Sequence, residues 1–229
     1  NNKIKIGHLK GNKFFIRLKR VQAMHRMKIE SALKQIATFG IPNYFGFQRF
    51  GIDGDNYKKG EAVIAGTLKV RDRKLKQMYI NAYQSYLFNS WLSKRIEIGK
   101  IVDAFKATEI SEKLGLRVET IKQLQSQKHP FKVFKGDVFS HYPYGKLFNI
   151  EDLEVESEKF FLQDRVPTGL LSGNKTKFAT DDALKFEEDF RRETKEDGAR
   201  RFAWIFPSDI SSEYKDERAW FELSFELPK

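Results

Sequence analysis

Alternation of apolar and polar residues predicts strands at both ends of the chain. Phe14, Ile16 and Leu18 alternate with polar residues, after a shorter alternating run at residues 3–6. Residues 219–227 alternate in the same way. Because side chains along a strand point to opposite faces in turn, Phe14, Ile16 and Leu18 are expected on one face. Residues 219–227 are expected to form a strand with one face buried.

Helical spacing appears next. Ile29, Leu33 and Ile36 recur at intervals of three and four within residues 23–39, which predicts a helix. Gly40 and Pro42 are typical of its end, because glycine favours the C-cap and proline cannot continue a helix.

Two further helices are expected at residues 57–65 and 74–97, the second ending near Gly99. Its aromatic residues, Tyr86 among them, are interpreted as core rather than as ligand contacts. The preceding run, residues 70–74, admits two readings: a phosphate-binding patch, or a helix start at which Asp72 pairs with the neighbouring arginines.

Residues 100–206 are less regular, and glycine and proline interrupt them repeatedly. The expected elements are short helices at 101–105 and 118–125, an extended segment at 131–139, a helix at 150–161, a loop at 166–171, a charged helix from Thr180 or Asp181 to before Gly198, and an extended segment at 202–206.

Residues 40–51 contain three glycines, one proline and four aromatic residues, a composition that excludes an ordinary helix or central strand. A shaped loop is predicted instead. Its aromatic rings together with Gln48, Arg49 and Phe50 suit stacking on unpaired bases and contact with phosphate. The alternative is a hairpin whose aromatic residues fill a core.

Composition narrows the class of protein. The chain has 229 residues, enough for one large domain or two modest ones, and no cysteine. Disulfides, thiolate metal sites and cysteine nucleophiles are therefore excluded, which fits a reducing, cytoplasmic location. Apolar runs are too short for a membrane span, and the first residues lack the apolar core of a signal peptide.

The charge is strongly positive and unevenly distributed. Lysine and arginine exceed aspartate and glutamate by eleven (42 − 31). Residues 1–39 hold ten basic residues against Glu30 alone, whereas residues 206–229 are net acidic. A polyanion, most naturally a nucleic acid, is the expected partner; the alternative is a generic solubilising surface.

A polar turn at residues 7–12 places Lys10 and Asn12 beside Phe14. An amide can pair with the edge of a uracil, a ring can stack on it and a cation can hold phosphate, so these three residues have the chemistry of a base pocket, with Arg17 as a further phosphate contact. In isolation, an asparagine after a glycine is more often only a turn residue.

Other chemistries find little support. The four histidines are scattered without metal-ligand spacing, so no metal site is expected. Asp53 to Asn56 lacks the distal glutamate of a calcium loop. Residues 169–176 carry Asn174 where a phosphate-binding loop needs its second glycine. No nucleophile elbow is present, and no glycine-rich loop for a methyltransferase cofactor is visible.

Several ordered motifs resemble the tRNA pseudouridine synthase D (TruD) family. They are Gly7-His-Leu-Lys-Gly-Asn-Lys-Phe14, Pro42-Asn-Tyr-Phe-Gly46 with Gln48-Arg-Phe-Gly51, Val70-Arg-Asp-Arg73, Ser85-Tyr-Leu-Phe-Asn89, Val166-Pro-Thr-Gly169, Arg200-Arg201 and Phe225-Glu-Leu-Pro228. They extend over essentially the whole chain.

The resemblance implies an α+β fold in which residues 1–39 and 206–229 are parts of a pseudouridine synthase sheet domain, and residues 40–205 are an inserted α/β TRUD domain. It implies a cytoplasmic, monomeric enzyme that isomerises the uridine at tRNA position 13, without metal or organic cofactor. Asn12 and Phe14 match residues of the family's active-site cleft.

The nucleophilic aspartate of the family lies in a Gly-x-Lys-Asp motif that precedes the segment starting here at Gly7. The nearest local likeness, around Asp216, lacks the glycine and is interpreted as a turn. The motif is therefore expected upstream of Asn1, so that this chain alone would be inactive. The competing interpretation is a non-catalytic RNA-binding module.

Overall fold

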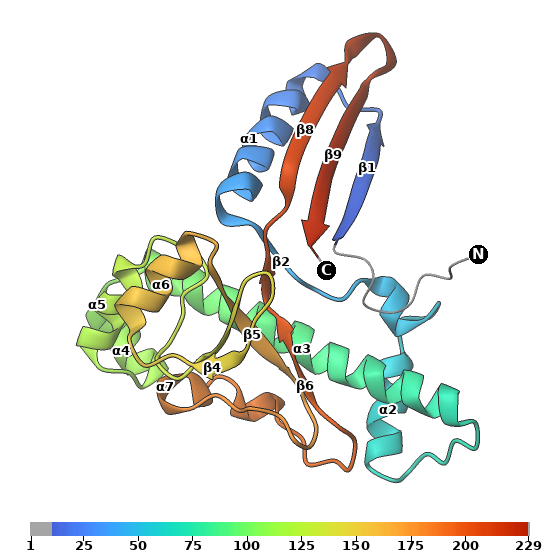
Figure 1. Ribbon diagram of the computed structural model, residues 1–229, viewed down its shortest axis with the longest axis vertical. Coiled ribbons are helices and arrows are strands. Elements are labelled where there is room, and N and C mark those ends of the chain that lie inside the picture. Colours follow the sequence, from blue (N-terminus) through green and yellow to red (C-terminus); the bar gives the residue numbers. More distant parts are fainter. Residues whose placement is uncertain (1–10, 229) are drawn as a thin grey trace. The chain divides into compact units, whose positions relative to one another are not determined.

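The computed structural model describes residues 11–228, which form two compact units. Unit 1 takes in the described residues up to Pro42 and from Trp204 onward, and unit 2 runs from Asn43 to Ala203. Helices and strands occur in both units, so the fold is α+β, as the sequence predicted (Figure 1).

Unit 1 consists of one helix and two small groups of strands. Its elements are β1 (Gly11–Lys19), α1 (Ala23–Phe39), β2 (Ile41–Pro42), β7 (Trp204–Ile205), β8 (Ser208–Lys215), the 3-10 turn η3 (Asp216–Arg218) and β9 (Trp220–Pro228).

The main sheet of unit 1 is antiparallel in the order β1-β9-β8, and α1 lies alongside β8 (Figure 1). Phe14 is paired in register with Phe225, and Leu18 with Phe221. The apolar positions of both predicted strands therefore share one face of the sheet. Strand β8 was not predicted, because it has no apolar alternation and is recruited by pairing with β9.

Unit 2 is larger and has more residues in helices than in strands. Its elements are η1 (Phe47–Phe50), α2 (Asn56–Ile64), α3 (Arg73–Ala104), α4 (Ala107–Leu114), α5 (Val118–Ser126), β3 (Val138–His141), β4 (Leu147–Asn149), α6 (Leu153–Phe161), β5 (Arg165–Leu171), α7 (Asp181–Leu184), η2 (Glu188–Phe190) and β6 (Ala199–Phe202).

Helix α3 organises unit 2. Asp72 caps it by accepting a hydrogen bond from the Leu75 amide at 2.9 Å, which favours the helix-start reading of residues 70–74. The predicted end near Gly99 is wrong, because the helix continues to Ala104. Gly99 serves close packing instead: a Cβ there would lie 2.5 Å from the carbonyl oxygen of Pro130. Residues 101–105, predicted as a separate helix, are its last turn, and α4 was missed.

The segment 166–171, predicted as a loop, is strand β5 in the interior of the sheet β4-β3-β5-β6. Its Gly and Pro imitate a loop pattern, but Val166 and Leu170 are buried. Pro167 lacks an amide hydrogen, yet its carbonyl still accepts from the Ala203 amide at 2.8 Å. Gly169 is needed because a Cβ at this position would clash with the Trp91 ring.

The charged helix expected from Thr180 or Asp181 to before Gly198 is also wrong. Only α7 and the single turn η2 form there. Glu187 leaves the helical path because its carboxylate is buried, accepting from the Ala179 amide at 2.9 Å and from Arg200 at 2.6 Å. Likewise, the extended segment predicted from residue 131 becomes a strand only at Val138.

A buried ion pair fixes α3 to the turn before β3. Nη1 and Nη2 of Arg95 each donate to one carboxylate oxygen of Asp137 at 2.7 Å, and Nη2 also donates to the carbonyl of Lys132 at 3.0 Å. Arg95 is only 1% exposed, and Phe134 lies 4.6 Å from its guanidinium. The core of unit 2 therefore includes a paired charge, although Nε of Arg95 is buried there without a hydrogen-bond partner among the described residues.

Candidate functional site

Strand β1 positions two of the predicted pocket residues. Asn12 and Phe14 lie two residues apart and therefore on the same face of the sheet. Both side chains are exposed, and the Phe14 ring stacks on Phe225 with centroids 5.3 Å apart. Lys10, predicted as their companion, lies outside the described residues.

Arg17, on the other face of β1, has protein partners. Its Nε donates to Glu222 at 2.7 Å, and its guanidinium lies 4.4 Å from the Trp220 ring. Glu222 also accepts from Nζ of Lys215 at 2.6 Å. The acidic segment near the end of the chain thus lies directly beside the basic β1 and offsets part of its charge. That Arg17 contacts phosphate remains a prediction.

This cluster predicts a pH dependence of stability. Hydrogen bonding from Lys215 and then from Arg17 holds the pKa of Glu222 below its ordinary value of 4.5. A lowered pKa in the folded state contributes stability that is present above about pH 4.5 and is lost as the pH falls through the folded value. Thermal unfolding measured between neutral and acidic pH should show this loss.

The variant Glu222→Gln should be less stable at neutral pH and should lose less stability on acidification. Glu226→Gln is the matched control, because Glu226 lies on the same strand and its contact with Lys13 is exposed and 3.9 Å long. Equal acid profiles for Glu222→Gln and the unsubstituted chain would contradict the assignment.

In unit 2, the loop that precedes η1 is held by two asparagines. Asn43 donates to the Phe202 carbonyl at 2.9 Å. Asn89 of α3 accepts from the Phe45 amide at 2.9 Å and donates to the Phe45 carbonyl at 3.0 Å. These bonds fix the loop to β6 and α3, so its side chains have defined positions.

Two arginines flank the ring of Phe45. The guanidinium carbon of Arg201 lies 3.9 Å from the ring centroid and that of Arg49 lies 5.0 Å from it. Arg201 donates to the side-chain oxygen of Asn43 at 2.6 Å and to its carbonyl at 3.1 Å, and both acceptors are uncharged. We refer to Arg49 and Arg201 as the arginine pair.

The arginine pair is electrostatically uncompensated within the described residues. Desolvation, followed by the charge of Arg49, lowers the pKa of Arg201 to about 10. No carboxylate contributes to that shift. Arg201 is still charged at neutral pH, so an anion bound beside it would offset the electrostatic cost of its burial and the repulsion from Arg49.

An open groove of about 380 Å³ lies beside η1, and we call it the aromatic groove. Its floor and walls are mainly rings, and Asn89, Ser90 and Ser93 supply polar atoms. The rings are those of Tyr44, Phe47, Phe50, Tyr57 and Tyr86.

The aromatic residues of the loop differ in burial, so that one packs toward the core and another lies open at the groove. Phe45 is half-buried against Phe88, as the core-filling alternative expected, whereas Phe47 is 93% exposed. Tyr86, interpreted from the sequence as core, is 39% exposed and lines the groove. Helical periodicity could not reveal this, because the groove is formed by α2 and η1 approaching the face of α3 on which Tyr86 lies.

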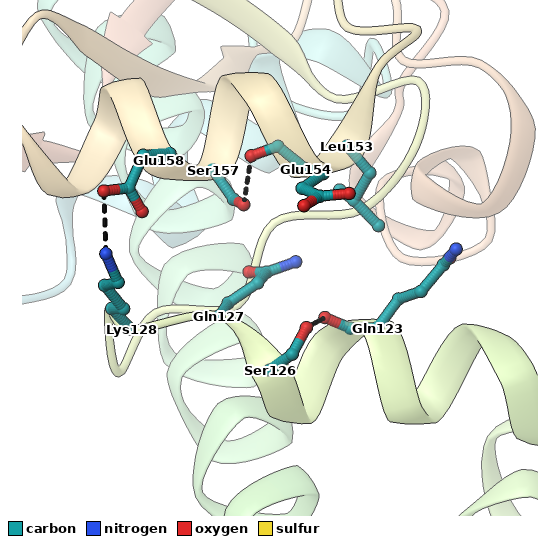
Figure 2. A pocket seen from close by; sticks show the side chains of 8 residues that line it. All are labelled: Gln123, Ser126, Gln127, Lys128, Leu153, Glu154, Ser157 and Glu158. Carbon is teal, nitrogen blue, oxygen red and sulfur yellow. Dashed lines mark hydrogen bonds and ion pairs between the residues drawn. The ribbon is translucent and has the colours of Figure 1, made fainter.

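A second pocket, between α5 and α6, has the features of an ordinary polar surface cleft (Figure 2). Lys128 pairs with Glu158 at 2.8 Å, and Ser157 donates to the Glu154 carbonyl at 3.0 Å. Lys128 and Glu158 are thus already paired, Ser157 bonds to the main chain of its own helix, and none of the predicted site residues lines the pocket.

The structure divides the predicted site residues between the two units. Asn12, Phe14 and Arg17 belong to unit 1, and Gln48, Arg49 and Phe50 share η1 in unit 2. Within residues 11–228, no group of three or more His, Asp or Glu side chains is arranged to hold a metal ion. No helix in that range is both long and apolar enough to cross a membrane.

Comparison with solved structures defines the class of fold. The structure of this chain superimposes on a crystal structure assigned as a tRNA pseudouridine synthase D (TruD) from Methanosarcina mazei, with a TM-score of 0.68. The match covers 100% of this chain and 68% of that one, at 16% sequence identity. The chain therefore has the α+β fold of that structure.

Sequence comparison then gives the family. The sequence model of the family described as tRNA pseudouridine synthase D (TruD) matches residues 1–70 and 55–229 of this chain. The chain therefore belongs to this family. It is 50% identical to the tRNA pseudouridine synthase D of Sulfurimonas denitrificans, 52% identical to that of Nitratiruptor sp. and 48% identical to that of Helicobacter pylori strain J99. Each alignment covers the whole chain but only 63–64% of the relative's length.

Proposed function

We propose that this chain is the RNA-holding part of an enzyme that converts a uridine of tRNA to pseudouridine. The observation that carries the proposal is the identity of about half of all residues, over the full 229, with proteins named tRNA pseudouridine synthase D. The uridine at tRNA position 13 is the proposed target, by resemblance to the family.

The proposed roles follow from residue chemistry. The flipped uracil would stack on Phe14 and pair with the amide of Asn12, at a cost of a few kcal/mol for unstacking the base from the tRNA. Both side chains are exposed on one face of β1 and are therefore accessible to a base. Lys10, Arg17 and η1 would hold phosphates and neighbouring nucleotides, and the nucleophilic aspartate is expected upstream of Asn1.

Domain roles are part of the same proposal. Residues 1–39 and 206–229 would belong to the catalytic sheet domain, and residues 40–205 would form the inserted TRUD domain. The enzyme is proposed to act as a cytoplasmic monomer without metal or organic cofactor.

The test is pseudouridine formation in tRNA, measured by mass spectrometry after chemical labelling, with the protein encoded by the complete reading frame. We expect activity in that protein and none in the 229-residue chain. Asn12→Ala in the active protein should lower turnover by roughly a hundredfold, a loss in the range of general acid–base and positioning contacts, with unchanged thermal stability.

Gln22→Ala is the matched control for Asn12→Ala and should retain full turnover, because it removes an exposed amide of unit 1 that makes no side-chain cap bond. Unchanged turnover of Asn12→Ala would remove Asn12 from the pocket. RNA binding without isomerisation by the complete protein would favour the non-catalytic RNA-binding module. Pseudouridine formation by the 229-residue chain alone would show that the nucleophile lies within it.

A further inference from the structure

The aromatic groove offers flat ring faces rather than a closed apolar cavity. Tyr57 of α2 and Tyr86 of α3 are stacked, with centroids 4.1 Å apart and planes inclined by 10°. The Phe50 ring meets Tyr57 edge-on at 6.4 Å. Rings from three elements thus pack on one another, and a planar ligand can stack on the ring faces that they leave open.

The groove remains accessible. Tyr44 and Tyr86 are each 39% exposed, and Phe47 projects beside them almost fully exposed. Apolar surface gathered in one concave place marks a binding site more often than scattered exposed residues do. The groove volume of about 380 Å³ is within the range of small-molecule sites.

The arginine pair does not line the groove, but its charge on the bordering loop restricts the class of ligand. Arg49 lies between Gln48 and Phe50 on η1, and Phe50 lines the groove. Arg201 reaches the same loop through Asn43 and Phe45. A purely apolar partner would leave the arginine pair without a counter-ion, whereas a ligand with a ring and an adjoining anion satisfies both features.

We infer that the aromatic groove and the arginine pair together bind one unpaired nucleotide of RNA, with the base on the rings and an adjoining phosphate on the two guanidinium groups. The choice of RNA as the polymer rests on the proposed function. This site differs from the proposed Asn12 and Phe14 pocket, which would hold the uridine that reacts. The groove and the arginine pair would only bind a nucleotide, by stacking and by charge. Base–aromatic stacking accepts any base, so the expected selectivity is for unpaired over paired nucleotides.

The experiment measures binding of a short single-stranded RNA that carries one 2-aminopurine, with the 229-residue chain. Stacking on the rings should quench the fluorescence of the 2-aminopurine. A double-stranded RNA of the same sequence and an abasic ribose-phosphate strand are the comparison probes. The duplex should give no quenching, and the abasic strand should bind more weakly.

Two variants remove the rings, and two remove the charges. Phe47→Ala and Tyr86→Leu should each weaken binding of the single strand by about tenfold and abolish most of the quenching, without affecting the abasic strand. Arg49→Gln and Arg201→Gln should weaken both strands, and each should reduce the slope of log affinity against log salt by about 0.7.

Matched controls use exposed residues of unit 2 away from the groove. Phe105→Ala removes an exposed ring, and Lys100→Gln removes an exposed charge on α3. Arg201→Lys keeps the charge but loses the planar fork, so it should restore the salt slope but only part of the affinity. Ring variants that bind and quench like Phe105→Ala would overturn the inference.

The failure of this inference and that of the proposed function are distinguishable. Full pseudouridine formation with an unaltered KM by Phe47→Ala and Arg201→Gln versions of the complete protein would remove the groove from substrate binding while leaving the activity intact. Groove-dependent binding of unpaired RNA by a complete protein that makes no pseudouridine would support the nucleotide site in the groove and contradict the proposed function.

Discussion

Replacing Arg95 by alanine is expected to lower the free energy of unfolding by about 3–5 kcal/mol, because the carboxylate of Asp137 would be left buried without its partner. Asp137 is 4% exposed, and its remaining bond, from the Phe134 amide at 2.7 Å, cannot compensate a charge. The carbonyl of Lys132 would also lose its donor. Urea unfolding followed by circular dichroism measures the change.

Lys94→Ala is the matched control, since Lys94 precedes Arg95 on α3 and pairs with Asp189 at 2.7 Å in an exposed ion pair. It should cost no more than about 1 kcal/mol. The double variant Arg95→Met with Asp137→Asn removes both charges, and it should recover part of the loss. Comparable costs for Arg95→Ala and Lys94→Ala would contradict a stabilising role for the buried pair.

The second large effect is expected at Glu187. Its carboxylate accepts from Arg200 at 2.6 Å, and both side chains are almost completely buried, at 3% and 2% exposure. Burial lowers the pKa of Arg200, and Glu187 opposes that shift. Glu187→Ala would leave the Arg200 guanidinium in the core without its ion-pair partner, with only the charge of Asp137, within the described chain, still opposing the effect of burial. The substitution should cost about 3–5 kcal/mol, measured by the same urea titration.

Asp189→Ala, two residues away, removes an exposed carboxylate and should cost no more than about 1 kcal/mol. Glu187→Gln keeps an acceptor for the Ala179 amide, so its cost in unfolding free energy should lie between those of Glu187→Ala and Asp189→Ala. Because Arg200 also donates to both oxygens of Thr168 on β5, the loss should include reduced amide protection in β5. Full protection of β5 in Glu187→Ala would contradict this link.

The sequence predicted elements well where local pattern and tertiary packing agree. The helix over 23–39 has the predicted bounds, because the apolar spacing and Gly40 specify it locally. Strand β5 was missed because its Gly and Pro are dictated by neighbours distant in sequence, among them Trp91. Similarly, no local signal indicates that Glu187 is directed to Arg200 rather than continuing a helix.

The candidate site was likewise predicted where residue types signal it locally and missed where tertiary packing completes it. The residue types of Gln48, Arg49 and Phe50 indicated ligand chemistry from composition alone. Their completion by Tyr57, Tyr86 and Arg201 depends on the packing of α2, α3 and β6, which no sequence period encodes. The positive charge that the sequence concentrates in residues 1–39 is partly offset in the fold, because the strand register places Glu222 opposite Arg17.

The two ends of unit 2 are adjacent. The Asn43 amide donates to the Ala203 carbonyl at 2.9 Å, and the flanking residues Ile41 and Pro42 pair with Ile205 and Trp204. A segment of 161 residues, from 43 to 203, therefore departs from and returns to the chain at a single point. Such modular connectivity means that this segment could be lengthened, exchanged for another or deleted across evolution with a bridge of only a few residues.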